Sequence, residues 1–348
     1  MARNDMQPDM LQELKRAIRE RNPGRLYFFY GEEVFLLQYY LNQLKKILTD
    51  ELTESFNYHK FTEESFDLRG FADAVESLPM MSEYTFVWVD DIDIFKLTED
   101  ERAKLCDVLS DIPDYCTVVF TFETVAWKPD KRLKKLWDII STRSAVVEFA
   151  KQSQSALISW ITRHFSANGK QITPDLCVYL IDLTGGTMTA LAGEIDKICA
   201  YSEAERIVKQ DIDAVVEPVM DAVVFQMTDM LGQGAYGAAL SKLQQLLKMQ
   251  EPPIKILAAI GSQFRRMSTA RILMDHGKTA SDLTRLCGIK EYAAQKTMSS
   301  AKRFSLAFYE KTAGLILETD RAMKTSFDDQ ERLLELLILD IAQEARNG

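Results

Sequence analysis

The sequence predicts an α/β domain built on a parallel sheet, followed by an all-α region that makes up the rest of its 348 residues. Two observations predict this fold class. Short runs rich in β-branched and aromatic residues alternate with segments of helical period up to about residue 150. After that point the strand-like runs stop, and every periodic segment places apolar residues three and four positions apart. Strands that alternate with helices are typical of a parallel sheet covered by helices on both faces.

Five runs predict the strands of this sheet, because each is dense in the residue types that fit a buried, pleated surface. They are LYFFY (26–30), FNYHKF (56–61), TFVWVDD (85–91), CTVVFTFE (116–123) and SAVVEF (144–149). The segments between them have helical period and predict helices over 34–48, 68–78, 98–112 and 130–141.

The remainder predicts helices separated by Gly, Pro or Asn-Gly breaks. The expected helices lie within 155–169, 173–185, 187–202, 222–234, 236–250, 252–277, 304–326 and 328–346. An acidic turn at Glu217-Pro218 separates two helical groups and predicts a second boundary there. We therefore expect three domains, at 1–150, 151–217 and 218–348.

The overall composition is that of a folded soluble protein, with 47% apolar and 27% charged residues, which excludes disordered and fibrous classes. The five cysteines form no CxxC pair, so neither a zinc ribbon nor a disulfide framework is expected: Cys106, Cys116, Cys177, Cys199 and Cys287. Residues 1–22 are charged and lack the apolar run of a signal peptide, and no window approaches the ~20 apolar residues of a membrane span. These observations predict a cytoplasmic protein that is neither exported nor embedded in a membrane.

Charge is unevenly distributed between the expected domains. Residues 1–150 hold 19 basic and 28 acidic side chains, whereas 251–303 hold 10 basic and 4 acidic ones. An acidic domain is repelled by phosphates and fits a protein partner better than duplex DNA. The basic bias of the second stretch fits either a solvated helix face or a local DNA contact, for which Arg265 and Arg266 are the candidates. If they do contact DNA, reversing both charges would change a DNA-dependent activity and leave protein binding intact.

The first strand-to-helix junction, YFFYGEEVFLL, lies where an α/β domain usually binds phosphate. A P-loop needs GxxxxGK[ST], and only Gly31 is present here. Glu32 and Glu33 place negative charge where a triphosphate needs positive charge, so we expect no nucleotide and no cofactor. The same two acids are equally suited to oppose the dipole of the following helix.

Catalytic and metal-binding patterns are not found. Asp90-Asp91 follows a strand as in a Walker B motif, but without a P-loop there is no phosphate-bound metal for it to hold, and a polar loop is the simpler interpretation. His59, His164 and His276 lie far apart, with neither HExxH nor GxSxG spacing. The sequence predicts no catalytic residue and no metal site.

A helix-turn-helix outline occupies residues 279–304, where two short helices flank Cys287-Gly288-Ile289. The second of these helices offers mainly Lys290, Gln295 and Lys296 to base edges. Ordinary helix packing produces the same pattern and is the favoured interpretation.

An apolar segment follows the expected helix that ends near Ser77. Leu78, Pro79, Met80 and Met81 form a loop, referred to below as the 78–81 loop, before the strand at 85–91. Pro79 lacks an amide hydrogen and disfavours helix at its predecessor, so the loop should stand off the helix end. Two interpretations are open: these side chains are part of the domain's own core, or they are an exposed plug that fills a pocket on a partner.

Taken together, these features resemble the delta subunit family of the bacterial DNA polymerase III clamp loader, in the form typical of bacteria with low-GC genomes. The matching stretches are LYFFYGEEVFLLQYYLNQLKK, SLPMMSE before TFVWVDD, LTGGTMTALAGEIDKICAY, EPPIKILAAIGSQFRRM, CGIKEYAAQK with AKRFS, and ETDRAMKTSFDDQERLLELLIL. No single stretch is as diagnostic as a P-loop, but their order and spacing extend over more than three hundred residues.

The resemblance implies an AAA+-like chain: a degenerate nucleotide-binding domain, a small helical lid and a C-terminal helical collar for oligomerisation. It implies a non-catalytic subunit of the ATP-driven clamp loader in the DNA polymerase III holoenzyme, which opens the beta sliding clamp for loading on primed DNA. The implied partners are that clamp and the delta-prime and gamma/tau subunits, with no membrane. The carried-over clamp contact is Leu78, Pro79, Met80 and Met81, where this sequence has methionines in place of the common phenylalanines.

Two alternatives from other classes stay open on the sequence alone. One is an ATPase with an unconventional phosphate loop, which would bind labelled ATP tightly with Mg²⁺. The other is a helix-turn-helix DNA-binding regulator, whose sequence-dependent affinity would survive moderate salt.

Overall fold

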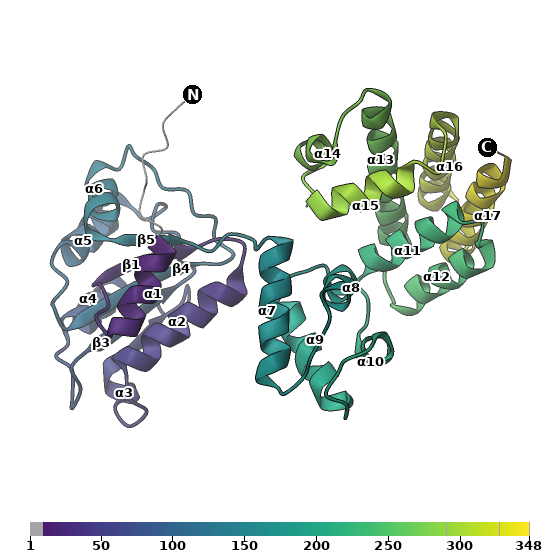
Figure 1. Ribbon diagram of the computed structural model, residues 1–348. Coiled ribbons are helices and arrows are strands. Elements are labelled where there is room, and N and C mark those ends of the chain that lie inside the picture. The colour runs from purple at the N-terminus through teal and green to yellow at the C-terminus, as the bar shows by residue number, and fades with distance from the viewer. Residues whose placement is uncertain (1–9, 290, 327, 348) are drawn as a thin grey trace. The chain divides into compact units, whose positions relative to one another are not determined.

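The computed structural model describes residues 10–289, 291–326 and 328–347, and the chain divides into two compact units, Met1–Ser153 and Gln154–Gly348. Figure 1 shows the sheet of the first unit and the helices of the second. The predicted order, an α/β region followed by helices, is confirmed.

The first unit contains a five-stranded parallel sheet. In sheet order its strands are β2 (Tyr58–Phe61), β3 (Thr85–Asp90), β4 (Cys116–Phe122), β1 (Leu26–Tyr30) and β5 (Ala145–Glu148). Every residue of the central strand β4 is buried, which explains why its sequence, CTVVFTF, contains no charged residue.

Helices cover both faces of this sheet (Figure 1). One face packs against α1 (Met10–Glu20) and α2 (Val34–Leu48), the other against α4 (Leu68–Glu76), α5 (Glu99–Ser110) and α6 (Lys134–Arg143). Side chains alternate along β1, so Phe28 packs in the core of one face and Phe29 in that of the other. A short helix, α3 (Glu54–Asn57), precedes β2, so the strand predicted from residue 56 begins at Tyr58 instead.

The regular secondary structure in the described residues of the second unit is helical, apart from an isolated bridge between Gln171 and Arg206. Its helices are α7 (Gln154–Ala167), α8 (Pro174–Thr184), α9 (Met188–Tyr201), α10 (Lys209–Val215), α11 (Met220–Gly232), α12 (Tyr236–Lys248), α13 (Pro253–Asp275), α14 (Ala280–Cys287), α15 (Glu291–Ala301), α16 (Leu306–Thr325) and α17 (Gln330–Asn347). The long helix α13 packs against α11, α15 and α16 around a core that includes Ile260, Phe264 and Met267.

Among the described residues, no single helix has the length and apolar character needed to cross a membrane, although α8 and α9, bent by 118°, meet that test as a pair. The N-terminal segment 1–22, which lacks the pattern of a signal peptide, lies partly outside the described ranges, since these begin at residue 10.

Candidate functional site

The 78–81 loop exposes its apolar side chains to solvent. Leu78, Met80 and Met81 are 72%, 54% and 95% exposed, and Pro79 is half-buried. The interpretation of these side chains as part of the core is therefore wrong. The helix α4 ends at Glu76 and Ser77 is already extended, so the chain has left the helix before Leu78, the residue at which Pro79 disfavours helical conformation.

Although its side chains are exposed, the backbone of this loop is firmly held. The carboxamide of Asn57 donates from Nδ2 to the Met80 carbonyl (2.9 Å) and accepts from the Met80 amide at Oδ1 (2.7 Å). The Thr85 hydroxyl donates to the Ser77 carbonyl (3.1 Å) at the start of the loop. Met81 has a φ of +53°, an uncommon conformation for a residue with a side chain, and these contacts maintain it. The loop therefore has a fixed backbone from which its apolar side chains extend into solvent.

Asn57 is a residue of this site that the sequence did not single out. It is fully buried at the end of α3. A polar side chain with a high hydrogen-bonding capacity inside the predicted strand at 56–61 is the sequence signal for it.

The position of a phosphate loop is filled by protein backbone. Gly31 has a φ of +133°, and a Cβ added there would lie 2.3 Å from the Phe149 carbonyl oxygen. The Glu33 amide donates to that same oxygen (2.9 Å), and the Phe149 amide donates to the Tyr30 carbonyl (2.7 Å). Glu32 pairs with Lys151 (2.5 Å), whereas Glu33 is buried at the N-cap of α2. The Glu33 amide, which would face a phosphate in a P-loop, is thus already bonded within the chain.

Asp90 and Asp91 form the polar end of strand β3 and hold the loop after β4. Asp91 accepts hydrogen bonds from the amides of Glu123, Thr124 and Val125 and from the Thr124 hydroxyl. Partial burial alone would raise the pKa of Asp91, but these hydrogen bonds outweigh it and place the pKa below the ordinary value. Asp90 accepts from the Thr121 hydroxyl and pairs with Lys60 (2.8 Å). Both carboxylates therefore have a structural role, as the polar-loop interpretation expects.

The three histidines lie on separate elements, β2, α7 and the end of α13. Burial lowers the pKa of His59, and His164 is 3.3 Å from Asp196. Within the described ranges, no group of three or more His, Cys, Asp or Glu residues has an arrangement that could hold a metal ion.

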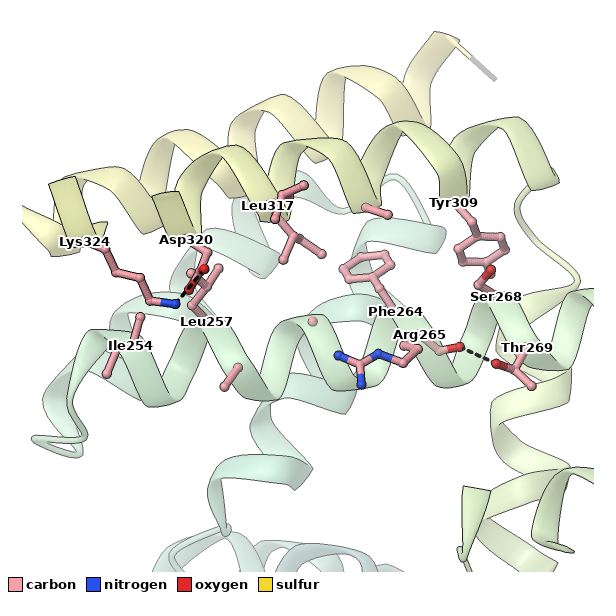
Figure 2. A pocket seen from close by; sticks show the side chains of 14 residues that line it. Ile254, Leu257, Phe264, Arg265, Ser268, Thr269, Tyr309, Leu317, Asp320 and Lys324 are labelled. Carbon is pink, nitrogen blue, oxygen red and sulfur yellow. Dashed lines mark hydrogen bonds and ion pairs between the residues drawn. The ribbon is translucent and has the colours of Figure 1, made fainter. Parts of the chain in front are cut away.

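Arg265 and Arg266 lie on α13 but do not act as one basic patch. Arg265 is exposed and lines a groove of about 700 Å³ between α13 and α16, while Arg266 is half-buried and outside that lining. Figure 2 shows Phe264 and Leu317 facing this groove, with an Asp320–Lys324 ion pair at one end. Gly261 on α13 and Ile316 on α16 approach closely at its base.

The helix-turn-helix outline is present as α14, Gly288 in the left-handed conformation, and α15. Lys290, one of its three candidate base contacts, lies outside the described residues. Lys296 pairs with Asp182 (3.0 Å) and lies over the Phe225 ring, so its charge is already used within the unit. Both helices pack against α13, as the helix-packing interpretation expects.

Comparison with known proteins places this arrangement in a family. The family model for DNA polymerase III, delta subunit, matches residues 27–150, and the one for the DNA polymerase III delta subunit, C-terminal domain, matches residues 221–341. The chain belongs to the DNA polymerase III delta subunit family.

Two curated relatives agree with this assignment to the delta subunit family. The DNA polymerase III subunit delta of Bacillus subtilis (strain 168) is 25% identical over 343 residues, which cover 95% of this chain and 97% of the relative. A probable DNA polymerase III subunit delta of Aquifex aeolicus (strain VF5) is 23% identical over 341 residues, 94% of either chain.

A solved structure has the same fold. The Bacillus subtilis DNA clamp loader delta protein superposes with a TM-score of 0.64 at 22% identity, covering 96% of this chain and 99% of that one. The 78–81 loop, Asn57 and the closed phosphate position all lie within the stretch that the delta subunit model matches.

Proposed function

We propose that this chain is the non-catalytic delta subunit of the DNA polymerase III clamp loader, and that it binds the beta sliding clamp through Leu78, Pro79, Met80 and Met81. The observation that carries the proposal is an exposed apolar loop whose backbone is fixed by a buried asparagine. Membership of the delta subunit family supports it.

The loop supplies binding energy by burial. Each Leu or Met side chain contributes about 1.5–3 kcal/mol when it is fully buried in a pocket. Met80 and Met81 adjust their shape to that pocket, because methionine has three rotatable bonds and a polarisable sulfur. Since the backbone is already ordered by Asn57, little backbone conformational entropy is lost on binding.

Ring opening then requires no bond chemistry. A clamp ring has closed and open forms, and a protein that binds the open form more tightly shifts the population toward it. The delta subunit provides this differential affinity, and the opened ring is placed on primed DNA during DNA replication.

ATP acts elsewhere in the complex, on the gamma/tau motor subunits, which assemble with this chain and with delta-prime. The backbone of Phe149 at the phosphate position supports a subunit that binds no nucleotide itself. We assign residues 218–348 to the collar that packs against neighbouring subunits, with the α13–α16 groove as a contact surface, and residues 151–217 to the lid. A local DNA contact at Arg265 and Arg266 is a minor part of the proposal.

The test is a binding titration of the purified chain with the sliding clamp of the same organism. The double variant Met80→Asp/Met81→Asp places two charges on the exposed loop, and we expect clamp binding to be lost. The melting temperature should stay that of the wild type, because both side chains are exposed. Leu339→Asp on α17, also an exposed apolar position, is the matched control and should bind normally. Unchanged binding by the double variant would exclude the loop as the contact, and a wild-type chain that does not bind the clamp would refute the function.

A further inference from the structure

A second exposed apolar pair lies on the segment that leads into β2. Leu52 is 87% exposed and Phe56 is 54% exposed. Single exposed apolar residues are ordinary on protein surfaces, but large ones gathered on adjoining segments mark an interaction site.

This segment, residues 50–57, has an ordered backbone. The Thr53 amide donates to the Asp50 carbonyl (3.0 Å), and the Leu52 amide donates to Oδ1 of Asp50 (2.9 Å). Glu54 on α3 pairs with Lys45 of α2 (2.5 Å), which ties the segment to the domain. Leu52 and Phe56 are therefore held in solvent by fixed structure.

The segment is joined directly to the 78–81 loop. Phe56 precedes Asn57, and the Asn57 carboxamide makes both of its hydrogen bonds to the backbone of Met80. One buried side chain thus connects the two exposed apolar groups, which lie on adjoining parts of the same domain. Glu51 is next to Leu52 in sequence and Glu83 follows the 78–81 loop. Both are exposed and add negative charge beside these apolar side chains.

We propose that Leu52 and Phe56 form a second contact area for the same partner as the 78–81 loop, the sliding clamp. This inference rests on the proposed function, because it takes its partner from it. The partner surface is then an apolar pocket for the 78–81 loop, with an adjoining apolar area for the aromatic ring and basic groups facing Glu51 and Glu83. An apolar centre with a charged rim is the usual anatomy of such an interface.

The experiment measures clamp binding by Leu52→Ser, Phe56→Ser and the double variant, with Leu339→Ser as the matched exposed control. We expect Phe56→Ser to weaken binding about tenfold or more, mainly through faster dissociation, and the control to bind like the wild type. The 78–81 loop variant Met80→Asp/Met81→Asp is measured in parallel. Wild-type affinity in the Leu52 and Phe56 variants, alongside lost binding in the 78–81 loop variant, would overturn this inference and leave the proposed function standing. A wild-type chain that does not bind would instead refute the function.

A second measurement does not depend on the variants folding. Amide hydrogen exchange of the wild-type chain with and without clamp should show slower exchange on binding in residues 52–57 as well as at the 78–81 loop. Protection confined to the loop would contradict the second contact area.

Discussion

The contact between Asn57 and Met80 shows how one buried side chain sets the form of a surface loop. A carboxamide offers both a donor and an acceptor, and here both are used on the backbone of one residue, Met80, 23 residues away. Removing either partner would leave a buried polar group without a hydrogen bond, which costs more than the bond itself contributes. The sequence shows an asparagine within a predicted strand, but it does not show which distant backbone group that asparagine contacts.

Asn57→Asp keeps the shape of the side chain and removes the donor. The Met80 carbonyl then loses its partner and faces a carboxylate oxygen, so we expect a loss of about 1–3 kcal/mol in the free energy of unfolding. Clamp binding should weaken as well, because the 78–81 loop is no longer held in one conformation. Urea unfolding and a binding titration measure the two effects. Asn42→Asp on the exposed side of α2 is the control and should change neither. A variant as stable as the wild type would show that the Asn57 contact is dispensable.

Among the elements, the junction after β3 makes the clearest structural use of charge. Asp91 has a φ of +59°, which aspartate tolerates better than most residues, and its carboxylate closes the loop after β4. In the sequence, a pair of acids after a strand suggests metal or phosphate chemistry. In the fold, Asp91 of this pair instead accepts hydrogen bonds from the backbone amides of the loop after β4. Burial raises the pKa of the nearby Glu123; a hydrogen bond from Gln38 opposes this shift, and the charges of Asp90 and Asp91 add to it.

Asp91→Asn should reveal this contribution through its pH dependence. The folded-state pKa of Asp91 lies below the unfolded value, so its stabilisation is present above about pH 4 and is lost as pH falls through the folded pKa. We expect the variant to be less stable by about 1–3 kcal/mol at pH 7, because the amide group that replaces one oxygen faces the Thr124 amide. The difference should shrink below about pH 4. Urea unfolding across this range measures it, with the exposed Asp138→Asn as control. A difference that stays constant down to pH 3 would contradict the assignment.

Most elements could be predicted from the sequence, and the exceptions have identifiable causes. Strand β1 and helix α2 match their predicted bounds, because a buried aromatic run and a long apolar period are strong signals. The helices α1, α3 and α10 were not predicted: α1 and α10 each bury a single residue, and α3 has only four residues. Gly31 was expected as part of a degenerate phosphate loop, but sequence could not show that the Phe149 backbone fills the space, since that contact joins distant segments.

For the candidate site, the sequence located the 78–81 loop and left its exposure open. Local pattern does not distinguish a Leu or Met that packs in its own core from one that is held for a partner, because both are apolar residues after a helix end. The fold decides between these two cases, because the buried Asn57 binds the backbone of Met80 and so holds the loop at the surface. Leu52 carried no sequence signal, and Phe56 was predicted as the first residue of a buried strand. Their exposure depends on the turn that precedes α3.

At the scale of the whole molecule, both units carry a surface that we propose as a binding surface. The first unit carries the acidic charge and the 78–81 loop, and the second carries the α13–α16 groove. Several of the basic side chains in and around α13 form ion pairs within the chain. The pairs are Lys255 with Glu251, Arg271 with Asp275 and Arg303 with Asp229. A groove lined by Ile254, Phe264 and Leu317 is therefore better suited to a protein neighbour than to DNA.

This distribution predicts that assembly and clamp binding can be separated by mutation. Leu317→Asp places a carboxylate in the apolar groove, on the same helix as Asp320, so a neighbouring subunit would have to bury an unpaired charge. We expect the variant to drop out of the clamp-loader complex in size-exclusion chromatography with the other subunits, while its affinity for the clamp stays within about twofold. The fold should persist, because Leu317 is among the exposed apolar residues. Tyr201→Asp at the end of α9, an exposed position outside the collar residues, serves as the control for an added charge and should enter the complex normally. If the Leu317→Asp chain still enters the complex, the subunit contact lies outside this groove. If the variant also loses affinity for the clamp, the two surfaces are not independent.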